Sequence, residues 1–156
     1  MDFELGTLKD ERLSRDTRWD MANTLKFEIV TPDATVYSAE VESVILEGVE
    51  GQMMILPQHA RLITQLVPGE MVVRRAGHDE FLAVGEGLVE VTGEHVAIVT
   101  DMAVAAESID EAKAEEARQR AAARLAEKLS SEEVAAVNAS LARSLAQLHV
   151  KRRPHK

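Results

Sequence analysis

The sequence predicts an antiparallel β-sandwich of about ten strands followed by a C-terminal α-helical hairpin. Over residues 21–105, short apolar runs are separated by turns rich in glycine and proline, which is typical of strands in a sandwich. From Ser108 onward the spacing of apolar residues lengthens from two to about 3.6, which indicates helices, and the sequence contains no further glycine. Two structured modules are therefore expected, residues 21–105 and residues 106–156.

The first module contains the strand signals. Leu25, Phe27 and Ile29 alternate with polar residues and predict a half-buried strand, which ends before Pro32. Turns at residues 76–79 and 92–94 predict two hairpins. The remaining strands are expected over residues 41–46, 53–56, 62–67, 71–74, 80–84, 88–91 and 95–100.

The second module contains two helix starts. Ser108 and Glu111 have the spacing of a capping box, and helix-forming residues continue from there to Leu129. Ser130 and Glu133 form a second such box, so a second helix is expected to turn back along the first. Its apolar stripe is predicted to contain Val134, Val137, Leu141, Leu145 and Leu148.

The apolar face predicted for the first helix consists mainly of alanine. Alanine allows close approach but buries little area, so this face is expected to pack weakly. A permanently packed hairpin and a hairpin that can leave the sandwich are both compatible with this composition. The face contains Ala112, Ala117, Ala121 and Ala122, with Ile109, Leu125 and Leu129 as its larger members.

Composition excludes several classes of protein. The chain has no cysteine, which excludes thiol catalysis and disulfides, and its net charge of −9 argues against a nucleic-acid binder. The charge is divided, with −10 over residues 21–107 and +3 over residues 108–156. No apolar run is long enough to insert into a membrane. Residues 1–20 have six acids and no apolar core, and are expected to be a disordered extension or to follow a start codon placed too early.

The residues that usually perform catalysis are sparse. None of the five histidines has a partner at a metal-ligand spacing, so no metal site is expected. Gly85-Glu86-Gly87 lies between predicted strands rather than before a helix, and is predicted to be a turn or bulge rather than a phosphate loop. The sequence therefore predicts a non-catalytic binding or regulatory subunit.

Three motifs give the chain a resemblance to a known family. They are residues 50–64 followed by Pro68-Gly69, then residues 85–91, then residues 109–114. In this order and spacing they resemble the epsilon subunit of bacterial F-type ATP synthase, over about residues 22–150. Gln52 stands where that family usually has glutamate, and Gln58 stands where it usually has glycine.

The resemblance implies a central-stalk rotor subunit of a proton-translocating ATP synthase, peripheral on the cytoplasmic face of the bacterial inner membrane. The sandwich would link the gamma subunit to the c-ring, with Glu50, Gln52 and His59 as candidate contacts. The hairpin would fold against the sandwich, or extend to the alpha and beta subunits and inhibit ATP hydrolysis. Its candidate contacts with acidic segments there are Arg118, Arg120, Arg124, Lys128 and Arg143, for which a solvated helix face is the alternative role.

Some members of that family bind ATP on the folded hairpin. Lys113 stands where they have arginine, and lysine does not provide the two-pronged contact that arginine makes with phosphate. The resemblance therefore implies weak ATP binding or none, and no other cofactor is expected. The positions that would form such a site are Ile109, Asp110, Lys113, Arg120 and Arg143.

Other classes of protein remain as alternatives. One is a non-catalytic sandwich adaptor with a helical arm in an unrelated complex, which co-purification with alpha, beta and gamma subunits would distinguish. Another is a free ATP-sensing module, which a titration with ATP would test. A small enzyme of the cupin kind would need histidines clustered on strands, and the sequence does not contain such a cluster.

Overall fold

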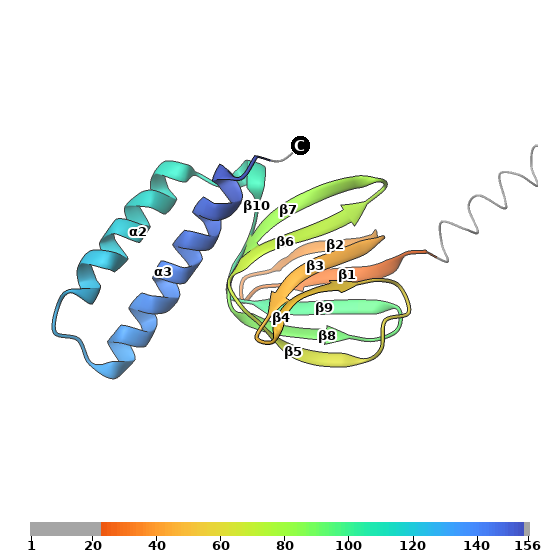
Figure 1. Cartoon of the computed structure of the whole chain (residues 1–156), viewed down its shortest axis with the longest axis horizontal. Coiled ribbons are helices and arrows are strands. Elements are labelled where there is room, and N and C mark those ends of the chain that lie inside the picture. The colour runs from red at the N-terminus through yellow and green to blue at the C-terminus, as the bar shows by residue number, and fades with distance from the viewer. Residues whose placement is uncertain (1–22, 155–156) are drawn as a thin grey trace, which may run out of the picture.

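The computed structural model describes residues 23–154, and the extension predicted over residues 1–20 lies outside them. This part of the chain forms a β-sandwich followed by two antiparallel helices, as predicted (Figure 1). The strands are β1 (Leu25–Val30), β2 (Thr35–Val41), β3 (Ser43–Gly48), β4 (Gly51–Ile55), β5 (Leu62–Leu66), β6 (Gly69–Arg75), β7 (His78–Val84), β8 (Gly87–Val91), β9 (His95–Thr100) and β10 (Ala103–Ala105).

Hydrogen bonding connects the strands in the order β10-β7-β6-β3-β5-β8-β9-β1-β2, with β4 paired to β3 alone. The link between β3 and β5 is a single pair, Gly48 opposite Leu66, at the point where the sheet folds over into two layers. Neighbouring strands are antiparallel except β1 and β9, which run parallel. The sandwich therefore has one layer of β10, β7, β6, β3 and β4, and a second of β5, β8, β9, β1 and β2.

The core of the sandwich lies between these layers. Phe27 and Ile29 are fully buried there, and the ring of Phe27 lies 5.4 Å from that of Tyr37, centroid to centroid. Every member of this hydrophobic cluster comes from strands β1 to β10. The sandwich therefore has a core that does not depend on the helices.

The strand predicted over residues 41–46 is in fact two strands. Val41 ends β2, and β3 begins at Ser43, because the chain crosses between layers at Glu42, whose N–H donates to the Arg74 carbonyl at 2.7 Å. Residues 35–40 of β2 and all of β10 have no counterpart among the runs identified in the sequence. β2 is an edge strand with mostly exposed residues, and β10 has three residues, so neither produces a clear apolar pattern.

The two helices are α2 (Glu111–Leu125) and α3 (Ser131–Arg152), preceded by the short 3₁₀ helix η1 (Ala106–Ser108). The capping box at Ser130 and Glu133 is confirmed, with both reciprocal bonds present. The box predicted at Ser108 is wrong. Asp110 caps α2 instead, accepting a hydrogen bond from the Lys113 N–H at 3.1 Å.

Helix α3 lies between α2 and the sandwich (Figure 1), and this position changes which residues are buried. Helix α3 packs against both α2 and the sandwich, so its buried residues differ from the predicted stripe. Of that stripe, Val137 and Leu148 are buried, but Leu145 is 48% exposed. On α2, Ala121 is buried as predicted, whereas Ala112 and Ala122 are exposed. α3 also buries residues outside the predicted stripe, namely Ser144, Ala146 and Val150.

Candidate interaction site

The hairpin contacts the sandwich through a small apolar cluster on the outer face of strands β7 and β10. Ala83 of β7 packs against Ile109 and against Val150 of α3, and all three are buried. The burial of Ile109 explains the displaced helix start, because it keeps the backbone extended just before Asp110. Partly buried residues complete this docking cluster: Phe81, Met102, Val104 and Ala106.

Polar contacts surround the docking cluster. The Arg143 guanidinium donates through Nη1 to Oδ2 of Asp101 at 2.8 Å. Further along α3, Lys151 donates through Nζ to the Ala106 carbonyl at 3.3 Å. Arg153, just after α3, forms an ion pair with Glu70 of β6. Long side chains of α3 thus hold the rim of a contact whose apolar centre is small.

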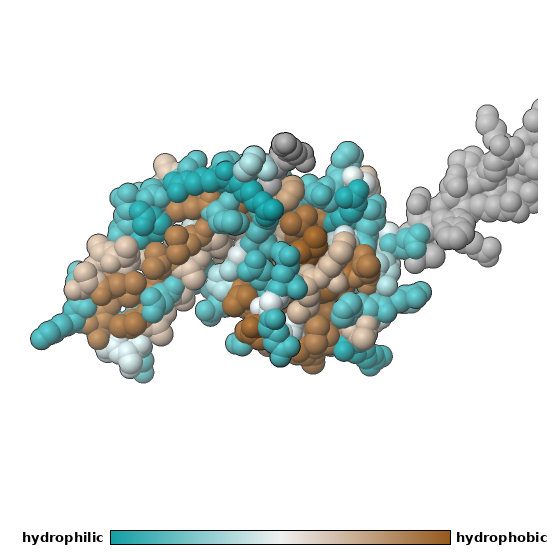
Figure 2. Space-filling view, viewed as in Figure 1, coloured by the Kyte–Doolittle hydropathy of each residue, from teal (hydrophilic) through white to brown (hydrophobic). Residues whose placement is uncertain are grey.

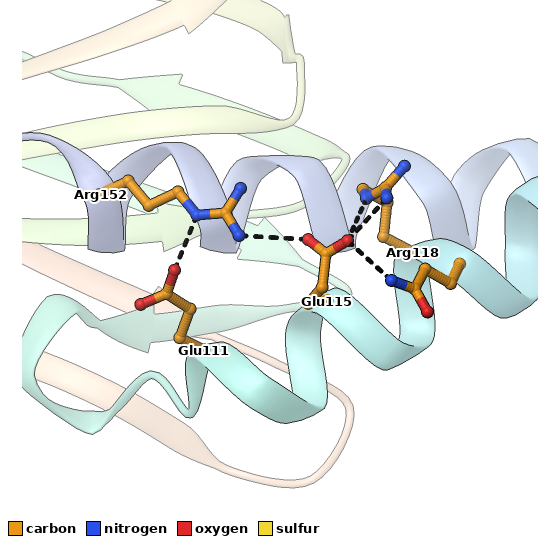
Figure 3. A network of polar contacts seen from close by, with 5 residues as sticks. Glu111, Glu115, Arg118 and Arg152 are labelled. Atoms are coloured by element: carbon orange, nitrogen blue, oxygen red, sulfur yellow. Dashed lines mark hydrogen bonds and ion pairs between the residues drawn. The ribbon is translucent and has the colours of Figure 1, made fainter.

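A second network joins the two helices to each other (Figure 3). Arg152 of α3 donates to Glu111 at 2.7 Å and to Glu115 at 3.2 Å. Arg118 donates to the same Glu115 carboxylate at 2.6 Å, and it holds the pKa of that carboxyl at about 2, with Gln119 and Arg152 acting in the same direction. Glu115 is therefore ionised at neutral pH and pairs α2 with α3.

The five cations predicted to contact acidic segments have different surroundings in the structure. Arg118 is paired within the hairpin, and Arg143 is paired with the sandwich. Arg120 is largely exposed and lies 3.9 Å from Glu116, and it lines a hollow between the helices together with Arg124. Lys128, in the turn between the helices, is exposed. Arg120, Arg124 and Lys128 thus occupy the half of the hairpin that lies away from the docking cluster.

The predicted nucleotide positions are dispersed in the docked hairpin. Ile109 is buried in the docking cluster, and the Asp110 carboxylate caps α2. Arg143 is held by Asp101. Of the five positions, Arg120 lines the hollow between the helices, whereas the others lie elsewhere along the hairpin.

The predicted sandwich contacts lie at two ends of β4. Glu50 is in the turn before this strand and Gln52 is within it, and both are exposed. His59 lies beyond its other end, where its Nδ1 is 2.7 Å from the Ala60 carbonyl. At about 3.3 Å per residue, the five residues of β4 span roughly 16 Å between these two ends. Next to His59, Gln58 has a φ of 65°, a left-handed conformation that suits the glycine usual at this position.

An exposed apolar row, absent from the predicted site residues, crosses the outer face of the second layer. Leu88 of β8 is opposite Val99 of β9, which is opposite Val30 of β1, and the three are 56%, 58% and 37% exposed. Ile63 of the neighbouring β5 is 72% exposed. The sequence did contain an indication of this row, because these strands have apolar residues both at the positions that face the core and at the alternate positions that face outward. Figure 2 shows separate patches of hydrophobic surface over both the hairpin and the sandwich on the face drawn.

A sandwich with its own core, an exposed apolar sheet face and a docked cationic hairpin define a two-module protein suited to contacts with other proteins. A family model described as ATP synthase, Delta/Epsilon chain, beta-sandwich domain matches residues 24–106. A second, described as ATP synthase, Delta/Epsilon chain, long alpha-helix domain, matches residues 107–152. The chain belongs to the ATP synthase delta/epsilon chain family, and the predicted family is confirmed.

Individual relatives agree with this assignment. The chain is 42% identical over 134 residues to an ATP synthase epsilon chain of Dehalococcoides mccartyi, covering 84% of this chain and 96% of the relative. It is 39% identical over 130 residues to an ATP synthase epsilon chain of Herminiimonas arsenicoxydans, covering 82% and 93%.

Solved structures share the fold at lower identity. One is the OSCP/F1/c-ring of the Euglena gracilis mitochondrial ATP synthase in rotational state 1, with a TM-score of 0.69 and 22% identity over 84% of this chain and 82% of the matched chain. Another is the central stalk/c-ring of the Tetrahymena thermophila enzyme, with a TM-score of 0.50 and 16% identity over 81% and 96%.

Proposed function

We propose that this protein is a non-catalytic central-stalk subunit of a bacterial F-type ATP synthase, and that its hairpin inhibits ATP hydrolysis when it leaves the sandwich. The names of its relatives support the first part, since they are ATP synthase epsilon chains. The titles of the solved structures with the same fold name the c-ring and the central stalk.

The sandwich is the module proposed to link the gamma subunit and the c-ring. The apolar row Val30, Leu88 and Val99, extended by Ile63, suits a protein partner because large exposed apolar patches mark interaction sites. Glu50 and Gln52, in and beside an exposed turn, remain the proposed contacts with the c-ring. No helix within residues 23–154 is apolar enough over a sufficient length to cross a membrane. The proposed contact with the c-ring places the subunit peripherally, on the cytoplasmic face of the inner membrane.

The observation that carries the regulatory part is the composition of the docking cluster. Three buried residues, of which one is alanine, form its centre, and a partly exposed ion pair between Arg143 and Asp101 lies on its rim. Exposed ion pairs typically contribute less than about 1 kcal/mol each. Such a contact can open without unfolding a sandwich whose core lies elsewhere. An opened hairpin would present Arg118, Arg120, Arg124, Lys128 and Arg143 to acidic segments of the alpha and beta subunits.

Deleting residues 108–156 is expected to raise ATP hydrolysis by the assembled enzyme several-fold. The deletion removes the proposed inhibitory element but leaves the sandwich core and the apolar row intact. Hydrolysis by the complex with the truncated subunit, compared with the complex containing the full chain, measures the effect. Retention of the gamma subunit and the c-ring on co-purification is the control for assembly. Unchanged hydrolysis in a fully assembled complex would refute the inhibitory role.

ATP binding to the hairpin is proposed to be weak or absent. Arg143 and Asp110 already have partners within the chain, and Lys113 offers a point charge in place of a planar guanidinium. Calorimetric titration of the isolated full chain with ATP is expected to give little heat. A clear isotherm with a micromolar dissociation constant would contradict this expectation.

A further inference from the structure

We propose that Gly85, Asp101 and Arg143 form a latch. The Asp101 carboxylate lies in a socket at Gly85 and keeps Arg143 on the sandwich while the hairpin is docked. The existence of the latch is independent of the proposed inhibitory role, but its consequence for the enzyme rests on that role.

The socket is built by two chain segments that meet at one end of the sandwich. Gly85 follows β7, and its N–H donates to the Met102 carbonyl at 2.9 Å. A Cβ at Gly85 would lie 1.9 Å from Oδ1 of Asp101, so the carboxylate occupies space that is open only because residue 85 is glycine. The turn containing Gly85, which the sequence analysis predicted as a turn or bulge, thus positions an acid.

The backbone of the socket is fixed on its other side as well. The Asp101 N–H donates to the Glu86 carbonyl at 3.1 Å. Thr100, which is 3% exposed, donates through its hydroxyl to the same carbonyl at 2.7 Å. These bonds fix the backbone on both sides of the socket, and the Asp101 carboxylate lies between Gly85 and α3, with Oδ1 against Gly85 and Oδ2 towards Arg143.

Arg143 lies 42 positions after Asp101 in the sequence and donates a hydrogen bond to this second oxygen, Oδ2. Among the described residues, it is the one of the five candidate cations that forms an ion pair with the sandwich. The side chains of Arg143 and Asp101 are 38% and 36% exposed, so water and salt reach the pair. An exposed ion pair of this kind contributes less than about 1 kcal/mol and weakens as salt screens it.

The Arg143 guanidinium can therefore pair with either of two acids: Asp101 when the hairpin is docked, or an acidic segment of a neighbouring subunit when it is open. While Nη1 of Arg143 is bonded to Asp101, it is withheld from any acidic segment of a neighbouring subunit. Opening the hairpin exchanges one carboxylate partner for another rather than exposing an unpaired charge. We infer that Asp101 is a positioning residue that sets how often the hairpin opens.

The opening can be measured at Ala83, which is fully buried under the docked hairpin. The natural chain contains no cysteine, so Ala83→Cys places a single thiol in the docking cluster. The rate at which a thiol reagent labels it, relative to the rate for an exposed thiol, gives the opening constant in the isolated full chain. In this background, Asp101→Asn removes the charge of the latch, and Glu94→Gln removes a charge of the same kind at an exposed turn between β8 and β9.

Asp101→Asn is expected to raise the opening constant by about two- to fivefold at low salt. Glu94→Gln is expected to leave it unchanged, and high salt is expected to bring the unsubstituted chain towards the Asp101→Asn value. Arg143→Gln is expected to have the same effect as Asp101→Asn, with no further increase when both are combined. Equal opening constants and equal salt dependence for Asp101→Asn and Glu94→Gln would overturn the proposal.

Gly85→Ala tests the socket without changing any charge. It is expected to raise the opening constant as Asp101→Asn does, and to add nothing in its presence. If the Gly85→Ala chain had both the melting temperature and the opening constant of the unsubstituted chain, the proposed role of the socket would be refuted. In the assembled enzyme, Asp101→Asn is expected to lower ATP hydrolysis. If it increases opening but leaves hydrolysis unchanged, the latch stands and the inhibitory role fails.

Discussion

Replacing Gly87 with alanine is expected to lower the free energy of unfolding of the sandwich by about 3 kcal/mol. A Cβ at this position would lie 2.0 Å from the Val99 carbonyl oxygen and 2.9 Å from the Thr100 Cα. Both are backbone atoms of β9, the strand that pairs with β8 opposite Gly87. Unlike a flexible side chain, a paired strand cannot move aside without losing ladder hydrogen bonds on both of its edges.

Gly93→Ala is the matched control for this prediction. Gly93 lies in the turn at the other end of the same strand pair, and a Cβ there would meet nothing within 4 Å. Urea unfolding of the full chain, followed by circular dichroism, compares the two variants. Equal stability of the Gly87→Ala and Gly93→Ala chains would show that β9 accommodates the added methyl group, and would contradict the expected loss.

Sequence patterns correctly predicted structure where the hydrogen bonds that stabilise it join residues close together in the chain. The box at Ser130 and Glu133 is a signal of this kind, because both bonds join residues three apart. At Ser108 the same pattern failed. Burial of Ile109 against the sandwich favours an extended backbone at that residue, and Asp110 is then placed to cap the helix instead. Here a tertiary contact overrides a local propensity.

The candidate site shows the same division. The sequence identified Arg143 as a cation of the second helix, but its partner Asp101 lies in the sandwich, 42 residues earlier, and no pattern in one sequence joins the two. Arg152 was not selected at all, although it bonds to two carboxylates of α2. The outward apolar row was visible as Leu88 and Val99 in strands that are apolar in both phases, but the register that aligns them is a property of the folded sheet.

The prediction with the largest expected effect on regulation concerns the sandwich side of the docking cluster. Ala83→Lys places an ammonium where the side chain is fully buried under Val150 and Ile109. An uncompensated buried charge costs about 3 kcal/mol or more, so the opening constant is expected to rise by about 100-fold. In the docked state Glu70, which lies directly opposite Ala83 on β6, is already paired with Arg153 of the hairpin. Once the hairpin has left, this face of β7 is open to water and Glu70 can pair with the new ammonium, so the sandwich itself remains folded.

The two ways of removing the docked state should then have opposite effects on the enzyme. Ala83→Lys leaves the whole hairpin in place but undocked, so ATP hydrolysis by the assembled complex is expected to fall. Deleting residues 108–156 removes the hairpin, so hydrolysis is expected to rise. Ala34→Lys, which adds the same charge in the exposed turn between β1 and β2, is the control and is expected to change neither opening nor hydrolysis. Labelling of a thiol introduced as Val150→Cys measures opening in both lysine variants. A fully opened hairpin with unchanged hydrolysis would refute the inhibitory role, because an element that inhibits when it leaves the sandwich must act when nothing holds it there.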